Sequence, residues 1–123
     1  MAAINLDTAA RLDITCRKGD TFSLELDFGQ TIPGKAWTMH VRETDTSEGE
    51  ENIIIEADQP DQITITDFNG VTDSLLTVTI SAAIMEDIES GMYVYDLQNI
   101  GSSIGTKTYV FGLFKVNEDI TAF

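Results

Sequence analysis

Apolar and polar residues alternate along most of this chain with a period of two. From Thr21 to Phe28, Phe22, Leu24 and Leu26 share one face with Phe28, while polar residues occupy the positions between. Successive side chains of a strand point to opposite faces, so this alternation predicts a strand with one buried face. Runs of the same kind predict about eight strands, at residues 11–16, 21–28, 36–42, 52–57, 62–68, 74–80, 92–99 and 106–117.

The apolar positions of these runs predict the core. They are rich in branched aliphatic and aromatic side chains, and the threonines between them favour the pleated surface of a sheet. The predicted core residues are Phe22, Leu24, Leu26, Trp37, Met39, Val41, Leu76 and Val78.

Turn-forming residues separate the runs. Asn69-Gly70 follows residues 62–68, and this pair supplies the positive φ angles of a two-residue hairpin. Gly101–Gly105 joins the last two runs and predicts a second hairpin. Short strands with frequent turns are typical of an antiparallel sandwich and not of βαβ units.

One segment, Ser81–Glu89, favours a short helix. Ser81 is a suitable N-cap, Ile84 and Ile88 are four residues apart on one helical face, and Gly91 ends the pattern. We expect one or two helical turns connecting two strands.

The residues that follow this helix narrow the fold class. Gly91, Tyr93 and Tyr95 open a strand, and in immunoglobulin-like sandwiches a tyrosine at this entry returns its hydroxyl to nearby backbone and forms a structural corner. Tyr95 occupies the place of the usual cysteine, and Trp37 resembles the core tryptophan. Alternatively, Tyr93 and Tyr95 are ordinary strand aromatics. We predict an all-β fold, an antiparallel immunoglobulin-like β-sandwich of about seven to nine strands with one short helical connection.

The length of 123 residues fits one domain, predicted at residues 11–123, preceded by an amino-terminal arm at 1–10. The arm is weakly patterned, so it either orders against a partner or is a frayed terminus. Phe123 either meets a neighbour or folds onto its own domain. The candidate interface residues are Ala2, Ile4 and Leu6 in the arm and Ile120 and Phe123 at the other end, with the acidic loop 44–51 as a third region.

Charge narrows the class of partner. Twenty-one Asp and Glu against 7 Lys and Arg give a net charge of −14, which argues against nucleic acid and anionic membranes as partners. No apolar run reaches the roughly 20 residues of a membrane span, and the start Met1–Asp7 lacks the features of a signal peptide. The single cysteine, Cys16, excludes an internal disulfide.

No motif indicates chemistry. The one histidine, His40, and Cys16 lack the glycine-flanked serine of a nucleophile elbow or any other catalytic signature. Phosphate-binding and calcium-binding loops are also absent from the sequence. We therefore predict no enzymatic activity, no catalytic residue, no metal site and no cofactor. A small hydrolase would require His40 beside a serine and a carboxylate in a pocket.

An ordered set of four short motifs resembles a known class of proteins. The motifs are Ile14–Phe22, Trp37–Glu43, Gly91–Leu97 and Gly112–Thr121. Together they are similar to the small β-sandwich modules of tailed-bacteriophage virions, which include the amino-terminal domains of baseplate upper proteins and related head or tail accessory proteins. The resemblance spans about residues 12 to 121.

The resemblance implies a non-enzymatic virion structural protein. Expected partners are other virion proteins (capsid, portal or tail proteins), with the chain itself a homo-oligomer or present as lattice-bound copies, made in the host cytoplasm. Larger relatives continue beyond the last motif, which here lies close to Phe123. This departure favours a capsid-associated accessory (a decoration protein or head-fibre base) or a small tail or baseplate subunit over a receptor-binding protein. The alternative is a ligand- or carbohydrate-binding sandwich with exposed aromatics drawn from Tyr93, Tyr95 and Tyr109.

Overall fold

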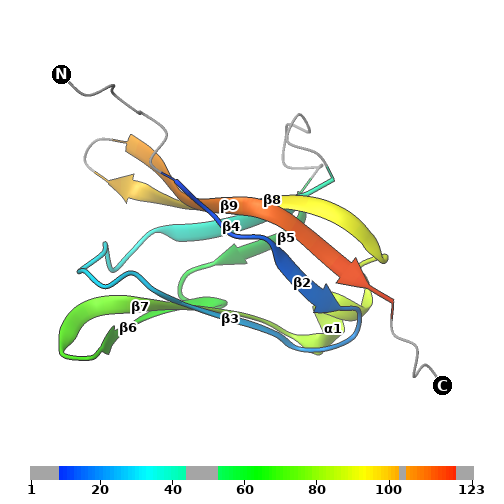
Figure 1. Ribbon diagram of the computed structural model, residues 1–123, viewed down its shortest axis with the longest axis horizontal. Helices are drawn as coiled ribbons and strands as arrows, with labels where there is room; N and C mark the ends of the chain where they lie inside the picture. The colour runs from blue at the N-terminus through cyan, green and yellow to red at the C-terminus, as the bar shows by residue number, and fades with distance from the viewer. Residues whose placement is uncertain (1–8, 44–52, 103–104, 119–123) are drawn as a thin grey trace.

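Two β-sheets face each other in the computed structural model, which describes residues 9–43, 53–102 and 105–118 (Figure 1). The larger sheet has six strands, with β1, β9, β8, β4 and β5 in that order and β2 also paired to β9. Its strands are β1 (Ala10–Arg11), β2 (Ile14–Arg17), β4 (Trp37–Arg42), β5 (Ile53–Asp58), β8 (Gly91–Ser102) and β9 (Gly105–Asn117).

The smaller sheet has the order β3, β7, β6, and both of its pairings are antiparallel. A two-residue turn joins β6 to β7, and its φ angles of 52° at Asn69 and 79° at Gly70 match the hairpin predicted from this pair. The strands are β3 (Phe22–Asp27), β6 (Ile63–Phe68) and β7 (Val71–Ile80). The two stacked sheets confirm the predicted all-β, immunoglobulin-like sandwich.

The amino-terminal strands differ from the expected pattern in two ways. The single strand expected at 11–16 is divided into β1 and β2, and both run parallel to β9 while the other pairings are antiparallel. The division follows from a bend at Leu12–Asp13. Parallel pairing arises because the first and last strands enter this edge of the sheet from the same end, with no hairpin between them.

The short helix α1 (Ala82–Glu86) connects β7 to β8, and the Ser81 side chain accepts a hydrogen bond from the Ile84 N–H at 3.3 Å. The expected apolar face is wrong in detail. Met85 and Ile88 are buried, whereas Ile84 is 42% exposed. The helix ends at Glu86, so Ile88 lies beyond it and does not share a helical face with Ile84.

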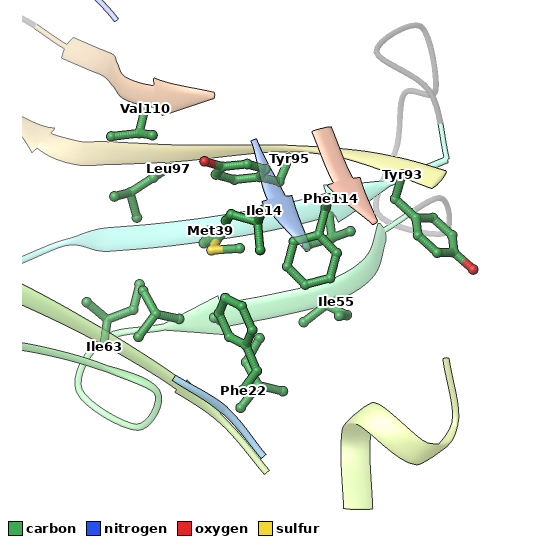
Figure 2. Close-up of a cluster of buried hydrophobic side chains, with 14 of the residues drawn as sticks. Ile14, Phe22, Met39, Ile55, Ile63, Tyr93, Tyr95, Leu97, Val110 and Phe114 are labelled. Carbon is green, nitrogen blue, oxygen red and sulfur yellow. The ribbon is translucent and has the colours of Figure 1, made fainter. Parts of the chain in front are cut away.

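The core lies between the sheets, where the alternating apolar side chains meet (Figure 2). Leu24 and Leu26 pack against this core but are only partly buried, because β3 is an edge strand and one side of its inward face has no neighbouring strand. The other predicted core residues are buried, namely Phe22, Trp37, Met39, Val41, Leu76 and Val78.

Candidate interaction surface

The corner at the start of β8 has the geometry expected from its motif. The Tyr93 hydroxyl donates a hydrogen bond to the Glu89 carbonyl oxygen at 2.6 Å, four residues earlier. Gly91 adopts a φ of 156°, and a Cβ added there would lie 4.0 Å from the Tyr93 ring. Burial, followed by the negative charges of Glu89 and Glu43, raises the pKa of Tyr93. Tyr93 therefore fixes the connection between α1 and β8.

Tyr95 has a different role from the one that the motif suggests. Its hydroxyl donates to the Leu12 carbonyl oxygen at 2.5 Å, 83 residues away in sequence. Its ring packs edge-on against Phe114, with ring centres 6.2 Å apart, deep in the core (Figure 2). Burial, with a smaller effect from the Asp13 charge, raises the pKa of Tyr95 to about 12. Tyr95 thus ties the amino-terminal segment to the middle of the larger sheet.

Gly112 allows the bend at Leu12–Asp13 to lie against β9. The Leu12 N–H donates to the Phe111 carbonyl oxygen at 2.9 Å, and the Asp13 carboxylate accepts from the Leu113 N–H at 3.0 Å. A Cβ added to Gly112 would lie 2.2 Å from the Leu12 carbonyl oxygen. Sequence reasoning missed this contact. The available signal was a glycine inside an otherwise regular strand, which indicates close approach of another backbone.

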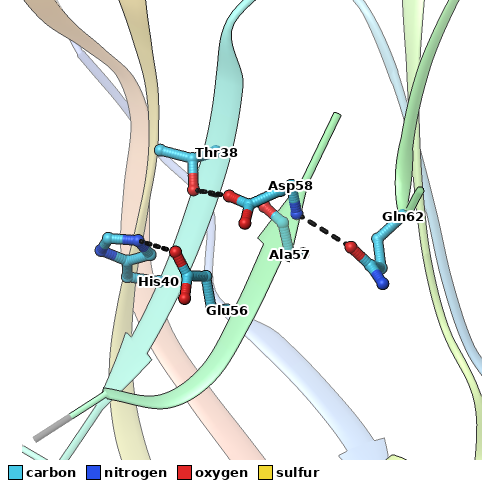
Figure 3. Close-up of polar contacts among 6 residues, drawn as sticks. All are labelled: Thr38, His40, Glu56, Ala57, Asp58 and Gln62. Atoms are coloured by element: carbon cyan, nitrogen blue, oxygen red, sulfur yellow. Dashed lines mark hydrogen bonds and ion pairs between the residues drawn. The ribbon is translucent and has the colours of Figure 1, made fainter. Parts of the chain in front are cut away.

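A row of three titratable side chains crosses the outer face of the larger sheet. His40 on β4 pairs in register with Asp96 on β8 and with Glu56 on β5. The His40 Nε2 atom lies 3.6 Å from a Glu56 carboxylate oxygen (Figure 3). Burial raises the pKa of Asp96, and electrostatic interactions with His40 and Arg42 and a hydrogen bond from Gln98 oppose this effect. The solvent-facing side of the sheet therefore holds interacting charges.

Polar groups beside this row are paired with one another. The Thr38 hydroxyl donates to the Asp58 carboxylate at 2.7 Å, and the Asp58 N–H donates to the Gln62 side-chain oxygen at 3.1 Å (Figure 3). Among the described residues, no buried side-chain nitrogen or oxygen lacks a partner. This part of the surface has no buried polar group left over to mark a ligand site.

Apolar side chains share the outer face with these charges. Val94 pairs with Leu113, and Asp96 pairs with Phe111, so these three apolar residues lie on the side opposite the buried Tyr93 and Tyr95. All three are only half-buried, because no further layer of described residues covers this face. Protein interfaces as a whole are about as apolar as the rest of the protein surface, so this mixture of apolar and charged residues is compatible with protein binding.

The residues considered for catalysis are not brought together. Within residues 9–43, 53–102 and 105–118, the ion-pair partner of His40 is Glu56, and neither a serine nor a cysteine hydrogen-bonds to the imidazole. The Cys16 thiol donates to the Lys115 carbonyl oxygen at 3.5 Å, and burial raises the pKa of Cys16 to about 11. The thiol is therefore protonated at neutral pH and is a poor nucleophile. No cluster of three metal-binding side chains occurs in the described part of the chain.

The aromatics considered for carbohydrate binding pack against one another. Trp37 is 1% exposed, and its indole N–H donates to the Pro33 carbonyl oxygen at 2.6 Å. The Tyr109 ring centre lies 4.7 Å from that of Trp37 and 5.9 Å from that of Phe28. These rings form part of the fold and not an open aromatic platform.

Several candidate positions lie outside the described residues. The acidic loop 44–51 is one of them, and nothing in the structure bears on its role. Ala10, the last residue of the expected arm, belongs to β1. The candidate interface residues outside the described ranges are Ala2, Ile4, Leu6, Ile120 and Phe123.

Among the described residues, no helix has the length and apolar character that a membrane span requires.

Comparison with known proteins gives only distant structural likeness. No protein-family model and no curated protein matches this chain. Among solved structures, the natural killer cell receptor Nkp44 is similar at 17% identity and a TM-score of 0.42, covering 89% of this chain and 98% of that one.

Two further solved structures are similar in the same way. An uncharacterized protein from Bacillus anthracis str. Ames has 15% identity and a TM-score of 0.46, covering 97% of this chain and 98% of that one. The extracellular domain of the voltage-gated sodium channel beta4 subunit has 11% identity and a TM-score of 0.38, covering 96% of this chain and 100% of that one. Likeness at this level carries no functional information, and the fold assignment rests on the strand order.

Proposed function

We propose that this chain is a non-enzymatic structural subunit of a tailed-bacteriophage virion that acts through protein–protein contacts. The observation that carries the proposal is the order of four sequence motifs, from Ile14–Phe22 to Gly112–Thr121, along a single β-sandwich. In this proposal the subunit is a capsid-associated accessory or a small tail or baseplate protein, and its partners are other virion proteins.

The surface chemistry supports a protein partner over a small ligand. Val94, Phe111 and Leu113 lie beside the His40–Asp96 pair on a sheet face that no other described element covers. A rigid sandwich with such a face suits repeated assembly on a symmetric particle. The net charge of −14 keeps free copies soluble and disfavours contact with packaged nucleic acid, which places the subunit on the outside of the particle in this proposal.

Incorporation into particles tests the proposal. Particles from which the source phage's own copy of this gene has been deleted are mixed with tagged chain and separated by density-gradient sedimentation. We expect the chain to sediment with the particles, and the variant Leu113→Glu to bind less because it places a charge on the apolar part of the outer face. The proposal fails if the wild-type chain stays entirely in the soluble fraction.

A carbohydrate-binding function has less support. The Trp37, Tyr109 and Phe28 rings pack against one another in tilted and edge-on arrangements, so they do not offer a flat exposed face to a sugar ring. Glycan-array binding that disappears in Tyr109→Ala would revive this alternative.

A further inference from the structure

The edge of β3 is unpaired among the described residues. β3 is the outer strand of the smaller sheet, and its pairing is with β7 alone. The Phe28 N–H donates to the Ser74 carbonyl oxygen, so the alternate residues Leu26 and Leu24 also bond to β7. The backbone N–H and C=O groups of Ser23 and Glu25 therefore point to the free edge. Such an edge is a template for an added strand.

A groove of about 390 Å³ runs along this edge, between β2 and β3. Figure 1 shows β2 and β3 as strands of opposite sheets, and both strands contribute residues to the groove walls. Its apolar lining comes from the inward faces of both strands and from the bend that precedes β2. These residues are Leu12, Ile14, Cys16, Phe22 and Leu24. A strand added to β3 would place every second side chain into this apolar groove.

The outer side of β3 restricts which strand can be added. Glu25 and Asp27 are exposed there, so a strand rich in acidic residues would be repelled. Two β3 edges pairing with each other would bring these carboxylates together. A suitable strand has alternating apolar residues and little negative charge.

Residues 2–8 of the amino-terminal arm of this same sequence have that pattern. In Ala2-Ala-Ile-Asn-Leu-Asp-Thr8, Ile4 and Leu6 alternate with Asn5 and Asp7. Asp7 is its only ionisable side chain, in a chain that carries 21 Asp and Glu. Ile4 and Leu6 match the apolar groove, and the segment brings little charge to the acidic side of β3.

The segment fits the groove of a second copy better than its own. From Ala10 onward the chain lies on β9, and the turn at Lys18–Asp20 then returns it along β3. Residues 12–17 therefore line the same groove as the edge of β3, and a segment that precedes Ala10 would have to reverse direction to reach this edge. Of Asp7, Thr8 and Ala9, only Asp7 is a favoured turn residue, and neither glycine nor proline accompanies it.

We propose that residues Ala2–Thr8 of one copy add to the free edge of β3 in a second copy, with Ile4 and Leu6 in the groove between β2 and β3. The added strand bonds to the backbone of Ser23 and Glu25 and extends the smaller sheet. This heterologous contact links copies head to tail, and it closes into a ring or continues as a chain depending on the rotation between copies. The inference does not rest on the proposed virion function.

The molecular mass in solution tests this contact. We expect the wild-type chain to self-associate as its concentration rises in sedimentation equilibrium, and the double variant Ile4→Asp/Leu6→Asp to remain a monomer. Glu25→Pro removes an N–H at the free edge and no β3–β7 bond, so it should fold and self-associate about tenfold more weakly. The matched control Glu25→Ala keeps the N–H and should associate at least as well as wild type.

These outcomes separate the alternatives. A monomeric wild type at every concentration, or a double variant that still associates, overturns the proposal. If the double variant is monomeric but Glu25→Pro and Glu25→Ala behave alike, the arm binds elsewhere, and the assignment to β3 is wrong. Circular dichroism of each variant shows whether the sandwich is intact.

A disulfide cross-link tests the position of the arm directly, because the native thiol of Cys16 lines the groove. A chain carrying Leu6→Cys and Cys16→Ser is mixed with a tagged chain that keeps Cys16, and the mixture is oxidised. We expect a cross-linked pair of the two chains on a non-reducing gel, and much less from Asn5→Cys in the same background. Equal yields from the two positions, or no cross-link, would contradict the proposed register. An internal disulfide in Leu6→Cys with Cys16 retained would instead show that the arm covers its own groove.

Discussion

Two aromatic clusters close this sandwich in different ways. One contains Phe22, Tyr95 and Phe114, and the other contains Phe28, Trp37 and Tyr109. Val41, which pairs with Tyr95, lies four residues after Trp37 on β4, so the clusters are separated by about 13 Å along that strand. Both clusters span the two sheets, but their burial and polar contacts differ.

The Phe22–Tyr95–Phe114 cluster lies in the centre of the core. All three rings are buried, and the Tyr95 hydroxyl reaches the Leu12 carbonyl oxygen on the amino-terminal segment. In the Phe28–Trp37–Tyr109 cluster, only Trp37 is fully buried, and the Lys107 ammonium lies 4.7 Å from the Tyr109 ring centre. The comparison shows that position, and not residue type, decides which rings hold the two sheets and the first strand together.

Removing one ring from each cluster should give the largest difference in the free energy of unfolding between the two clusters. Phe114→Ala leaves a cavity where the side chain is 0% exposed, and we expect a loss of about 4 kcal/mol in the free energy of unfolding. Tyr109→Ala removes a half-buried ring and should cost only about 1–2 kcal/mol. Urea unfolding followed by circular dichroism measures both values. Equal losses would mean that the two clusters contribute equally.

The backbone contact beside the central cluster should come next in size. Gly112→Ala places a Cβ 2.2 Å from the Leu12 carbonyl oxygen, so the bend must move away from β9, and we expect a loss of about 3 kcal/mol. In the control Gly34→Ala, the nearest atom is an Asp73 carboxylate oxygen at 3.8 Å, and the change should be within about 0.5 kcal/mol. Thermal unfolding distinguishes them, and a Gly112→Ala variant as stable as the control would contradict the contact.

The two tyrosine hydroxyls allow a smaller comparison. Tyr95→Phe leaves the Leu12 carbonyl oxygen without this donor inside the protein, and we expect a loss of about 1.5 kcal/mol. Tyr93→Phe removes a bond at the rim of the sandwich and should cost about 0.5–1 kcal/mol. Amide hydrogen exchange gives a further readout: only Tyr95→Phe should speed exchange at Leu113, whose N–H bonds to Asp13 next to the bend. Faster exchange at Leu113 in both variants would contradict separate roles.

The smallest expected effect concerns alkaline pH. The pKa of Tyr95 is about 12 in the folded protein against the ordinary value of 10.0, so the folded state holds this proton more tightly than the unfolded state. Stability from this group is fully present below pH 10 and is lost as pH rises toward 12. Unfolding free energy measured from pH 9 upward should fall less steeply in Tyr95→Phe than in wild type. Cys16→Ser serves as the background, because the thiol also titrates in this range. Identical slopes would exclude Tyr95 as a contributor.

Only part of the candidate interaction surface could be predicted from the sequence. Composition marks the arm and the acidic loop 44–51 as interface candidates, but the loop and residues 1–8 of the arm lie outside the described residues. His40 was identified as the only histidine, but its position between Asp96 and Glu56 depends on the register of β4 with β8 and β5. The groove between β2 and β3 was not predicted, because it exists only where two strands of opposite sheets lie close together.

Local rules in the sequence determined the elements of this protein. The alternation at Phe22–Asp27, the positive φ angles available to Asn69-Gly70 and the capping hydroxyl of Ser81 each act within a few residues, so their outcome can be predicted from the neighbouring sequence. The expectation for Ile84 was wrong because helix length depends on where the next strand must begin.

Only the tertiary structure decided which distant segments meet. Tyr95 contacts Leu12 across 83 residues of sequence. The strands β1 and β2 pair with β9, in parallel, and do not pair with β3. Many pairings are compatible with the same alternating pattern, because each strand has one apolar face and two free edges. Close packing of the two sheets, with Gly112 allowing the backbone contact, selects one of these pairings and leaves the edge of β3 without a partner in the described part of the chain.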